Sequence, residues 1–505
     1  MTGRTIAQGA PRRLSRRDLH KVSLAAGAAM ATTSLAGRRS AAAAQATPAA
    51  DSDLDARFAE LDNFVAQRMT ELNVPGVALG VIAGDREHTA TFGVTNIDHP
   101  LPVDEKTLFQ VGSTTKTVTA TALMRLVEQE RLDLDGRVQT HLPEFRVGDP
   151  EVSANVRLRH LVTHTAGWLD GGVQETGDGD DALARFVAGM AGLPQIVPLG
   201  EYFSYNNAAV SLAGRVIEAV TGQTYEAAAT EMVLRPLGME RAAFFPEEIM
   251  NEAFAVGHGF PPGDPEGNPV VLEPWGLPRS LNPAGGLVSS LEEQLRYARF
   301  HLSDGTVDGS RVLSSESMRR MQEPLGPGGT VPTMPVPFDA VGVIWQLWQR
   351  DGQRIVSHPG GTAGQLSVFS LIPEQDLAWT LLTNAQSGLQ LGFEVTDRVL
   401  EGFLGLSPEP LGAAPIAGAP LAEFVGEYAN PDGSQTIRIR AADDTLHLEL
   451  SVPGQPGLES EMRPVGEDLF VVTYLWVTAL TDFVRDDTGK VAWVRFLGRL
   501  VPRVD

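Results

Sequence analysis

The sequence contains no cysteine. Without thiols the chain can form no disulfide, no thiolate metal site and no lipid anchor on a cysteine. Lysine is almost missing as well, because only four of the 40 basic residues are lysines and the other 36 are arginines. The difference matters chemically, since a desolvated lysine can lose its proton whereas an arginine cannot.

Long apolar runs and an excess of basic residues are also missing. No apolar stretch reaches the roughly 18 residues that a membrane-spanning helix needs. The formal net charge is −23. A surface this acidic argues against nucleic acids and anionic membranes as partners.

The remaining composition is that of an ordinary globular protein, with 43% hydrophobic and 20% charged residues. A chain of 505 residues is too long for one typical domain, so the length predicts two or three units.

The first 44 residues differ from the rest and resemble a twin-arginine export signal. Paired arginines precede a weakly apolar stretch, and small residues around Ala42 and Ala44 offer a cleavage site. The residues that fit the twin-arginine pattern are Ser15, Arg16, Arg17, Leu19 and Lys21. A disordered basic tail is the alternative interpretation. The signal predicts export to the periplasm or the medium.

Removal of residues 1–44 would make the chain more acidic. The segment holds eight of the 40 basic residues and one of the 63 acidic residues, so 32 basic and 62 acidic residues remain, a net charge of −30.

The chain from 51 to 405 alternates between strand-like and helical patterns. Apolar spacing predicts helices at 51–72, 113–131, 207–221, 290–302 and 389–405. Two strand-like runs flank "GDR" (84–86), which is a hairpin signal, and further strand-like runs follow from residue 340, beginning with "VGVIWQLWQR" (341–350). Residues 155–300 mix helices and loops.

The C-terminal part is organised differently. Residues 406–420, rich in proline, alanine and glycine, read as a linker. Residues 421–505 are dominated by short strands with turn signals such as "DDTG", which predicts a small β-barrel or sandwich. This module is interpreted as a packing or lid domain, with a cleft-narrowing or polymer-binding domain as the alternative.

The stretch "FQVGSTTK" places Ser113 and Lys116 three residues apart at the start of a predicted helix, so both side chains point to one face. The free N–H groups there favour developing negative charge on Ser113. Lys116 can accept the serine proton if it is partly desolvated. The alternative is that Ser113 is only a helix N-cap.

In the stretch "FSYNNAAV", Tyr205 and Asn207 lie two residues apart before an amphipathic helix. The tyrosine could act as a base if a nearby cation lowers its pKa, and the asparagine could hydrogen-bond a substrate amide and a lysine. Taken alone, the stretch is better interpreted as a capping loop, with Asn206 or Asn207 as N-cap and Tyr205 packed as a wedge.

The third stretch, "HPGGTAG" (358–364), is by itself compatible with a hairpin turn, a phosphate-binding loop or one wall of an active site. A phosphate-binding loop requires a following Lys-Ser or Lys-Thr pair, which is missing here.

Together the three stretches resemble the serine β-lactamase-like and penicillin-binding-protein family, in its class C branch that includes esterases and D-amino-acid peptidases. Its motifs Ser-x-x-Lys, Tyr-x-Asn and Lys/His-x-Gly occur here in the family's order. The likeness covers about residues 55–405, and supporting stretches lie at 156–168, 282–300 and 373–384.

The resemblance implies an α/β (α+β) fold: an antiparallel sheet flanked by helices, plus an all-helical region, with 421–505 similar to the small β-barrel appended to many relatives. It implies no metal and no organic cofactor. The expected partner is a small-molecule ester, amide or peptide substrate.

The resemblance also implies the catalytic roles. Ser113 would be the nucleophile that forms an acyl-enzyme, and Lys116 would activate it. Tyr205, as tyrosinate or through a hydrogen bond to Lys116, would be the base for acylation and would activate water for deacylation. Asn207 would orient Lys116 and the substrate.

The strand after "HP" would form the opposite wall of the cleft. His358 and Gly360 would lie there, with Gly360 letting the substrate approach the strand edge. The backbone N–H groups of Ser113 and Gly361 would form the oxyanion hole.

His358 stands where β-lactamases of this branch usually carry lysine. A histidine with an ordinary pKa near 6.5 is mostly neutral at neutral pH and holds a carboxylate weakly. The expected activity is therefore hydrolysis of esters or amides without a free carboxylate. A true β-lactamase or D-Ala-D-Ala-type peptidase is the first alternative, and a non-catalytic binding protein for cell-wall peptides is the second.

Three other residues have two possible readings. His160 and His164 lie four apart, a metal-ligand spacing, but no acidic residue completes a signature, and a cleft-lining loop is favoured. Trp168 could line the cleft or lie in the core.

Overall fold

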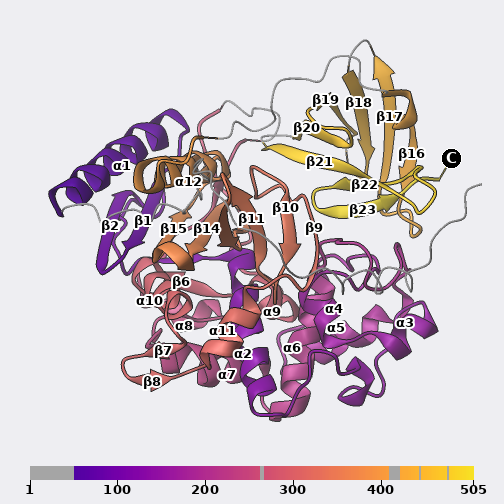
Figure 1. Cartoon of the computed structure of the whole chain (residues 1–505), viewed down its shortest axis with the longest axis horizontal. Coiled ribbons are helices and arrows are strands. Elements are labelled where there is room, and N and C mark those ends of the chain that lie inside the picture. Colours follow the sequence, from indigo (N-terminus) through magenta and orange to yellow (C-terminus); the bar gives the residue numbers. More distant parts are fainter. Residues whose placement is uncertain are drawn as a thin grey trace, which may run out of the picture. The chain divides into compact units, whose positions relative to one another are not determined.

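A nine-stranded antiparallel sheet lies at the centre of the computed structural model (Figure 1). Eight strands follow the order β2 (Arg86–Gly93), β1 (Gly76–Ala83), β15 (Leu377–Thr383), β14 (Gln365–Ile372), β12 (Gln353–Ser357), β11 (Gln346–Arg350), β10 (Phe338–Val341) and β9 (Gly326–Gly329). The ninth, β13 (Gly360–Thr362), pairs with β14. The structure describes residues 51–261, 267–408, 421–442, 445–455, 457–474 and 477–504. The export signal at 1–44 and linker residues 409–420 lie outside this range.

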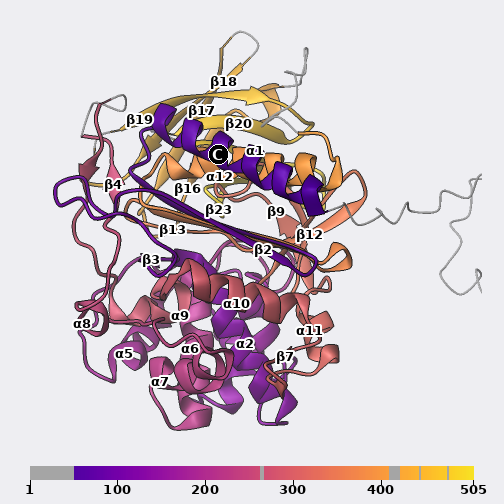
Figure 2. The same cartoon turned by 90° about the vertical axis from the view of Figure 1, so that its left-hand side faces the viewer.

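Helices cover both faces of this sheet. The pair α1 (Asp51–Glu71) and α12 (Gly388–Leu404) covers one face, and α10 (Leu291–Leu302) lies on the other (Figure 2). Strand β1 shows why, because alternate residues enter two different cores: Val77 and Leu79 pack with α1 and α12, whereas Ala78 packs with the helical region.

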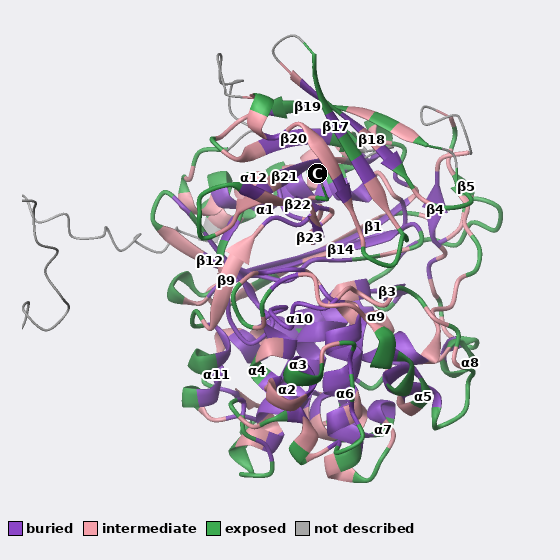
Figure 3. Ribbon diagram, turned by 90° about the vertical axis from the view of Figure 1, so that its right-hand side faces the viewer, coloured by how far each residue is buried: buried purple, intermediate pink, exposed green. Residues whose placement is uncertain are grey.

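The helical region contains most of the other helices. These are α2 (Thr115–Glu128), α3 (Pro150–Asn155), α4 (Leu158–Val162), α5 (Ala182–Gly189), α6 (Asn207–Thr221), α7 (Tyr225–Ala229), α8 (Pro246–Ile249), α9 (Asn282–Gly285) and α11 (Ser315–Met321). Helix α2 is almost fully buried, like β14 (Figure 3). None of the helices in the described part of the chain has the length and hydropathy needed to cross a membrane.

Short two-stranded pairs complete the main unit. They are β3 (Leu108–Gln110) with β6 (Val288–Ser290), β4 (His258–Gly259) with β5 (Val270–Val271), and β7 (Thr306–Val307) with β8 (Ser310–Arg311).

The C-terminal strands form an eight-stranded antiparallel sheet that is nearly closed. They follow in chain order: β16 (Gly426–Ala429), β17 (Thr436–Ala442), β18 (Thr445–Ser451), β19 (Leu458–Pro464), β20 (Leu469–Tyr474), β21 (Val477–Arg485), β22 (Val491–Phe496) and β23 (Arg499–Pro502). A bridge between Tyr428 and Arg503 brings the first and last strands together. The predicted fold class, an antiparallel sheet flanked by helices with a barrel-like C-terminal module, is thus confirmed.

Two local predictions were wrong in detail. The run 341–350 is not one strand, because the chain turns between β10 and β11, and Ile344 adopts a positive φ of 75° there. The predicted helix at 113–131 begins at Thr115, because Gly112–Thr114 forms a separate 3-10 turn, η1, that starts at a positive φ of 52°. Both departures come from backbone geometry that apolar spacing does not encode.

Candidate active site

Ser113 lies in η1, between strand β3 and helix α2. Gly112 permits this position, because its φ is 52° and a Cβ there would lie 2.5 Å from the backbone nitrogen of Gly361. The turn that carries Ser113 is therefore pressed against β13. Ser113 itself is half-buried and Gly361 is exposed, so both remain open to a ligand.

Lys116 lies one helical turn further, fully buried, and its Nζ donates a hydrogen bond to Ser113 Oγ at 2.9 Å. It also donates to the backbone oxygen of Ala284. Burial lowers the pKa of Lys116 to about 7; a nearby carboxylate, Asp170, opposes this shift and Arg499 adds to it. A large share of the amine is therefore neutral at neutral pH and can accept a proton.

Tyr205 lies beside Lys116, whose Nζ is 5.0 Å from the centre of the phenol ring. Its other neighbour is His164, stacked on it at 4.5 Å between ring centroids. Burial raises the pKa of Tyr205 to about 12, although contacts with Ser113 and Arg499 act in the opposite direction. Of the two roles that sequence left open, the tyrosinate is thus disfavoured, and a protonated phenol that hydrogen-bonds fits the site.

Asn207 is the first residue of α6, and its partner differs from the predicted one. Its side-chain amide donates to Asp170 Oδ2 at 3.3 Å and its backbone N–H to Asp170 Oδ1 at 3.0 Å. Among the described residues it has no hydrogen bond to Lys116. The prediction that Asn207 orients Lys116 directly does not hold here, because Asp170 takes up the amide instead.

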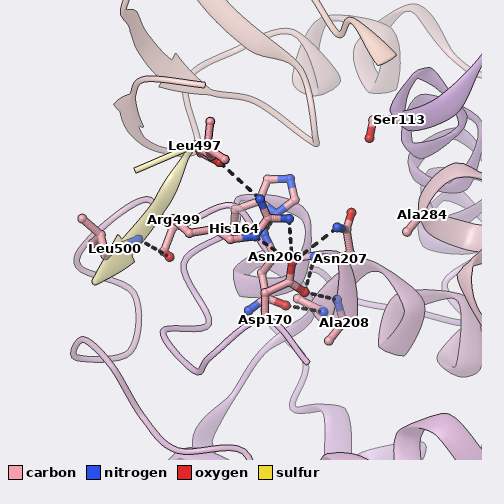
Figure 4. A network of polar contacts seen from close by, with 12 residues as sticks. Ser113, His164, Asp170, Asn206, Asn207, Ala208, Ala284, Leu497, Arg499 and Leu500 are labelled. Carbon is pink, nitrogen blue, oxygen red and sulfur yellow. Dashed lines mark hydrogen bonds and ion pairs between the residues drawn. The ribbon is translucent and has the colours of Figure 1, made fainter. Parts of the chain in front are cut away.

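Asp170 and Arg499 were not foreseen. Arg499 comes from β23 in the C-terminal module and donates from Nη2 to Asp170 Oδ2 at 2.7 Å. Figure 4 shows Asp170 between Arg499 and the start of α6, with Ser113 across from them. Neither residue belongs to a recognisable motif, and the two positions are 329 residues apart, so spacing along the chain carried no signal.

His358 follows β12 and is fully buried next to the site. Its Nδ1–H donates to Pro359 O at 3.0 Å, so the neutral ring keeps a lone pair at Nε2. Burial and the charge of Lys116 lower the pKa of His358 to about 3. The backbone oxygen of His358 accepts a hydrogen bond from Thr114 Oγ1 at 2.9 Å, which fastens this wall to η1.

Gly360 has a different role from the one predicted. A Cβ on Gly360 would lie 2.0 Å from Val111 O and 2.7 Å from Ser113 N, so it is the Ser113 turn that occupies the space beside this glycine. The close approach that requires glycine is therefore between two segments of the chain. The exposed neighbour Gly361 is the one that can face a substrate.

The two histidines with metal-ligand spacing take separate structural roles. His160 Nδ1 accepts the N–H of Arg157 and caps α4. His164, at a positive φ of 55°, accepts the N–H of Asn206 at 3.1 Å and lies against Tyr205. Within the described ranges no cluster of three or more potential metal ligands occurs. Trp168 is buried in the main core.

The fold and this serine–lysine–tyrosine arrangement together define the serine β-lactamase-like class. Residues 61–402 match the family model described as Beta-lactamase, and the chain belongs to this family. The predicted resemblance is thereby confirmed. Membership supports serine hydrolase activity in the broad sense.

Individual relatives agree with this assignment. The chain is 34% identical over 362 residues to "Penicillin-binding protein 4" of Amycolatopsis lactamdurans, covering 69% of this chain and 93% of that protein. A solved structure of SurE has a TM-score of 0.71 at 26% identity and covers 89% of this chain and all of that one. The D-amino acid amidase of Ochrobactrum anthropi SV3, at 22% identity and a TM-score of 0.58 over 69% of this chain and 99% of its own, shares the fold.

Proposed function

We propose that this protein is an exported serine hydrolase that cleaves an ester or amide bond through an acyl-enzyme on Ser113. The observation that carries the proposal is the 2.9 Å hydrogen bond between Lys116 Nζ and Ser113 Oγ, made by an amine whose pKa burial lowers to about 7. A serine is a weak nucleophile until a base takes its proton, and here a competent base is within reach.

In acylation, neutral Lys116 accepts the proton of Ser113 Oγ as the oxygen attacks the substrate carbonyl. The resulting oxyanion would receive hydrogen bonds from the backbone N–H groups of Ser113 and Gly361, each worth about 3–4 kcal/mol of barrier. The proton on Lys116 then passes, with the Tyr205 hydroxyl as relay, to the leaving alcohol or amine, which departs.

In deacylation, a water molecule attacks the acyl carbonyl and gives its proton to the same Lys116–Tyr205 pair. Collapse of the second oxyanion returns a proton to Ser113 Oγ and releases the acid. Because burial keeps the phenol protonated, Tyr205 acts as a proton donor and relay in both halves of the reaction.

The proposed substrates carry no free carboxylate next to His358. A buried neutral imidazole with a lone pair at Nε2 is an acceptor and favours a donor group such as an amide N–H or a hydroxyl over an anion. The proposed partner is thus a small-molecule ester, amide or peptide.

A second candidate is cleavage of an amide next to a D-amino acid. It is favoured by the solved structure of SurE with D-Leu, which has a TM-score of 0.70 at 26% identity to this chain. In this case His358 would face a part of the substrate other than its carboxylate.

The test is to incubate residues 45–505 with p-nitrophenyl acetate, nitrocefin and a D-Ala-D-Ala peptide, alongside Ser113→Ala, and to search Ser113 for an acyl adduct by mass spectrometry. We expect turnover of the ester and an adduct that Ser113→Ala lacks. Absence of both turnover and adduct with all three probes would reject the hydrolase and leave the non-catalytic binding protein.

Export is part of the proposal and rests on the sequence of residues 1–44. Replacing Arg16 and Arg17 by lysine in the full chain should retain the protein in the cytoplasm, measured by fractionation in a host with a twin-arginine system. The control is a Lys21→Arg chain, which keeps the arginine pair. Equal export of the double variant and the original chain would contradict the proposal.

A further inference from the structure

The carboxylate of Asp170 organises the segment that carries Tyr205 and Asn207. It accepts the backbone N–H groups of Asn207 at 3.0 Å and Ala208 at 3.2 Å, which are free donors at the start of α6. It also holds the Asn207 side chain. Only 6% of the Asp170 side chain is exposed. A nearly buried carboxylate in this position favours a paired state, because burial of a lone charge is costly.

The partner of Asp170 comes from the C-terminal module. Arg499 donates from Nε at 2.9 Å and from Nη2 at 2.7 Å to Asp170 Oδ2. Its Nη1 donates to Leu497 O at 3.2 Å, which fixes the guanidinium to the turn that precedes its own strand. The guanidinium carbon lies 5.4 Å from the centre of the Tyr205 ring.

Neutral contacts place the same module against the residues just before Asn207. The backbone N–H of Tyr205 donates to Gly498 O at 2.8 Å, and the N–H of Leu500 donates to Ser204 Oγ at 3.1 Å. Gly498 has a φ of 82°, and a Cβ there would lie 3.3 Å from Tyr205 Cβ. The turn between β22 and β23 therefore backs the tyrosine directly.

We propose that Asp170 and Arg499 are positioning residues for the reaction, through which the C-terminal module holds Tyr205 and the start of α6 in register with Ser113 and Lys116. This inference rests on the proposed function. The reason is geometric, because Tyr205 must stay within reach of Lys116 and a displacement of about 1 Å at a catalytic group costs roughly 100-fold in rate.

The pair also sets the charge around Lys116. The titratable groups that face Lys116 are Tyr205, His164, His358, Asp170 and Arg499. Burial keeps the phenol protonated and holds the pKa of both imidazoles below the ordinary value, so these three are uncharged at neutral pH. Asp170 raises the pKa of Lys116 and Arg499 lowers it, so the two oppose each other.

The experiment measures kcat, KM and the pH dependence of p-nitrophenyl acetate hydrolysis for Asp170→Asn, Arg499→Gln and the double variant. We expect kcat to fall roughly 10- to 100-fold in each single variant with a smaller change in KM. The acid limb of the pH–rate profile, which follows the titration of Lys116, should move to lower pH in Asp170→Asn and to higher pH in Arg499→Gln. We expect each shift to be roughly half a pH unit to one pH unit. The limb of the double variant should lie between them.

Two controls separate positioning from simple stabilisation. Arg485→Gln removes an arginine that is paired with Asp468 inside the C-terminal sheet, so it should lower the melting temperature without moving the limb or kcat. Arg499→Lys keeps the positive charge, so its acid limb should lie between that of Arg499→Gln and that of the original chain.

The inference is overturned if both single variants keep the original kcat and the original position of the acid limb. It is also overturned if they behave like Arg485→Gln, with a lower melting temperature and no other change. A shift of the limb in the same direction in both variants would overturn it as well. If the original chain neither hydrolyses p-nitrophenyl acetate nor acquires an acyl adduct on Ser113, the proposed function and this inference both fail. If the original chain is active but the variants do not show the expected changes, only this inference fails.

Discussion

Lys116 is the residue on which the proposed chemistry depends most. The sequence identified it as one of four lysines in an arginine-rich chain, placed three residues after a serine. Its usefulness as a base comes from burial, which brings its pKa to about 7. An exposed lysine at the same spacing would be almost fully charged at neutral pH and could not accept the serine proton.

A pH profile tests this directly. The active form has neutral Lys116, so kcat/KM for p-nitrophenyl acetate should rise with pH through an apparent pKa near 7 and fall about tenfold per pH unit well below it. Lys116→Arg, which keeps the charge but cannot lose it, should cost roughly 100- to 10,000-fold. An unchanged limb in Lys116→Arg would exclude Lys116 as the titrating base.

His358 is the residue that bears on substrate choice. Replacing it by lysine places a cation in the wall, so the activity on nitrocefin and a D-Ala-D-Ala peptide relative to p-nitrophenyl acetate should rise roughly 10- to 100-fold, the value of one hydrogen bond to a charged group. His358→Gln is the matched neutral control and should not change this ratio. If the ratio is the same in both variants, His358 does not govern the discrimination against carboxylates.

At the scale of elements, the contact between η1 and β13 decides where Ser113 sits. Two glycines permit it: Gly112 by its positive φ and Gly360 by the absence of a Cβ. The sequence predicted that "HPGG" forms a wall of the site, but the motif does not reveal that its two glycines have different structural roles. Gly360 admits the serine turn, and Gly361 is exposed.

The two glycines of β13 provide a matched pair of variants. In Gly360→Ala the new Cβ would lie 2.0 Å from Val111 O, so η1 must shift; we expect a loss of about 1–3 kcal/mol in the free energy of unfolding and a large loss of kcat. In Gly361→Ala the nearest atom is the flexible Leu366 Cδ1 at 3.0 Å, so stability should change little. Thermal unfolding and kcat report both effects, and equal stabilities of the two variants would refute the packing argument.

At the scale of the whole molecule, burial makes the fold sensitive to acid. His301, in an aromatic cluster with Tyr297 and Trp345, and His358 are both fully buried, and burial lowers the pKa of each to about 3. At pH values between about 3 and the ordinary imidazole pKa of about 6.5, these two histidines bind protons in the unfolded chain but stay neutral in the folded chain. The free energy of unfolding must therefore decrease as the pH falls from about 6.5 toward 3.

His301→Phe isolates one part of this dependence. The variant lacks the imidazole that binds one proton when the chain unfolds. The slope of the unfolding free energy against pH between about pH 6 and 4 should therefore drop by up to about 1.4 kcal/mol per pH unit. Denaturant titrations at several pH values measure it, and His447→Phe at an exposed position of β18 is the control. An identical slope in His301→Phe and the original chain would show that His301 is not held neutral by the fold.

The sequence alone determined that Ser113 and Lys116 lie side by side, because a spacing of three residues at the start of a helix is short enough for local backbone geometry to bring both side chains to one face. The family, the fold class and Tyr205 as a candidate came from the resemblance of the three motifs, in their order along the chain, to a known family. The domain boundaries at 405 and 421 and the export signal remain predictions from composition. Only the tertiary structure decided that Asn207 binds Asp170, that Gly360 packs on the serine turn, and that Arg499 of the C-terminal module reaches the site. These depend on contacts between distant segments and on the exclusion of water around Lys116 and Tyr205, and both exist only after the chain has folded.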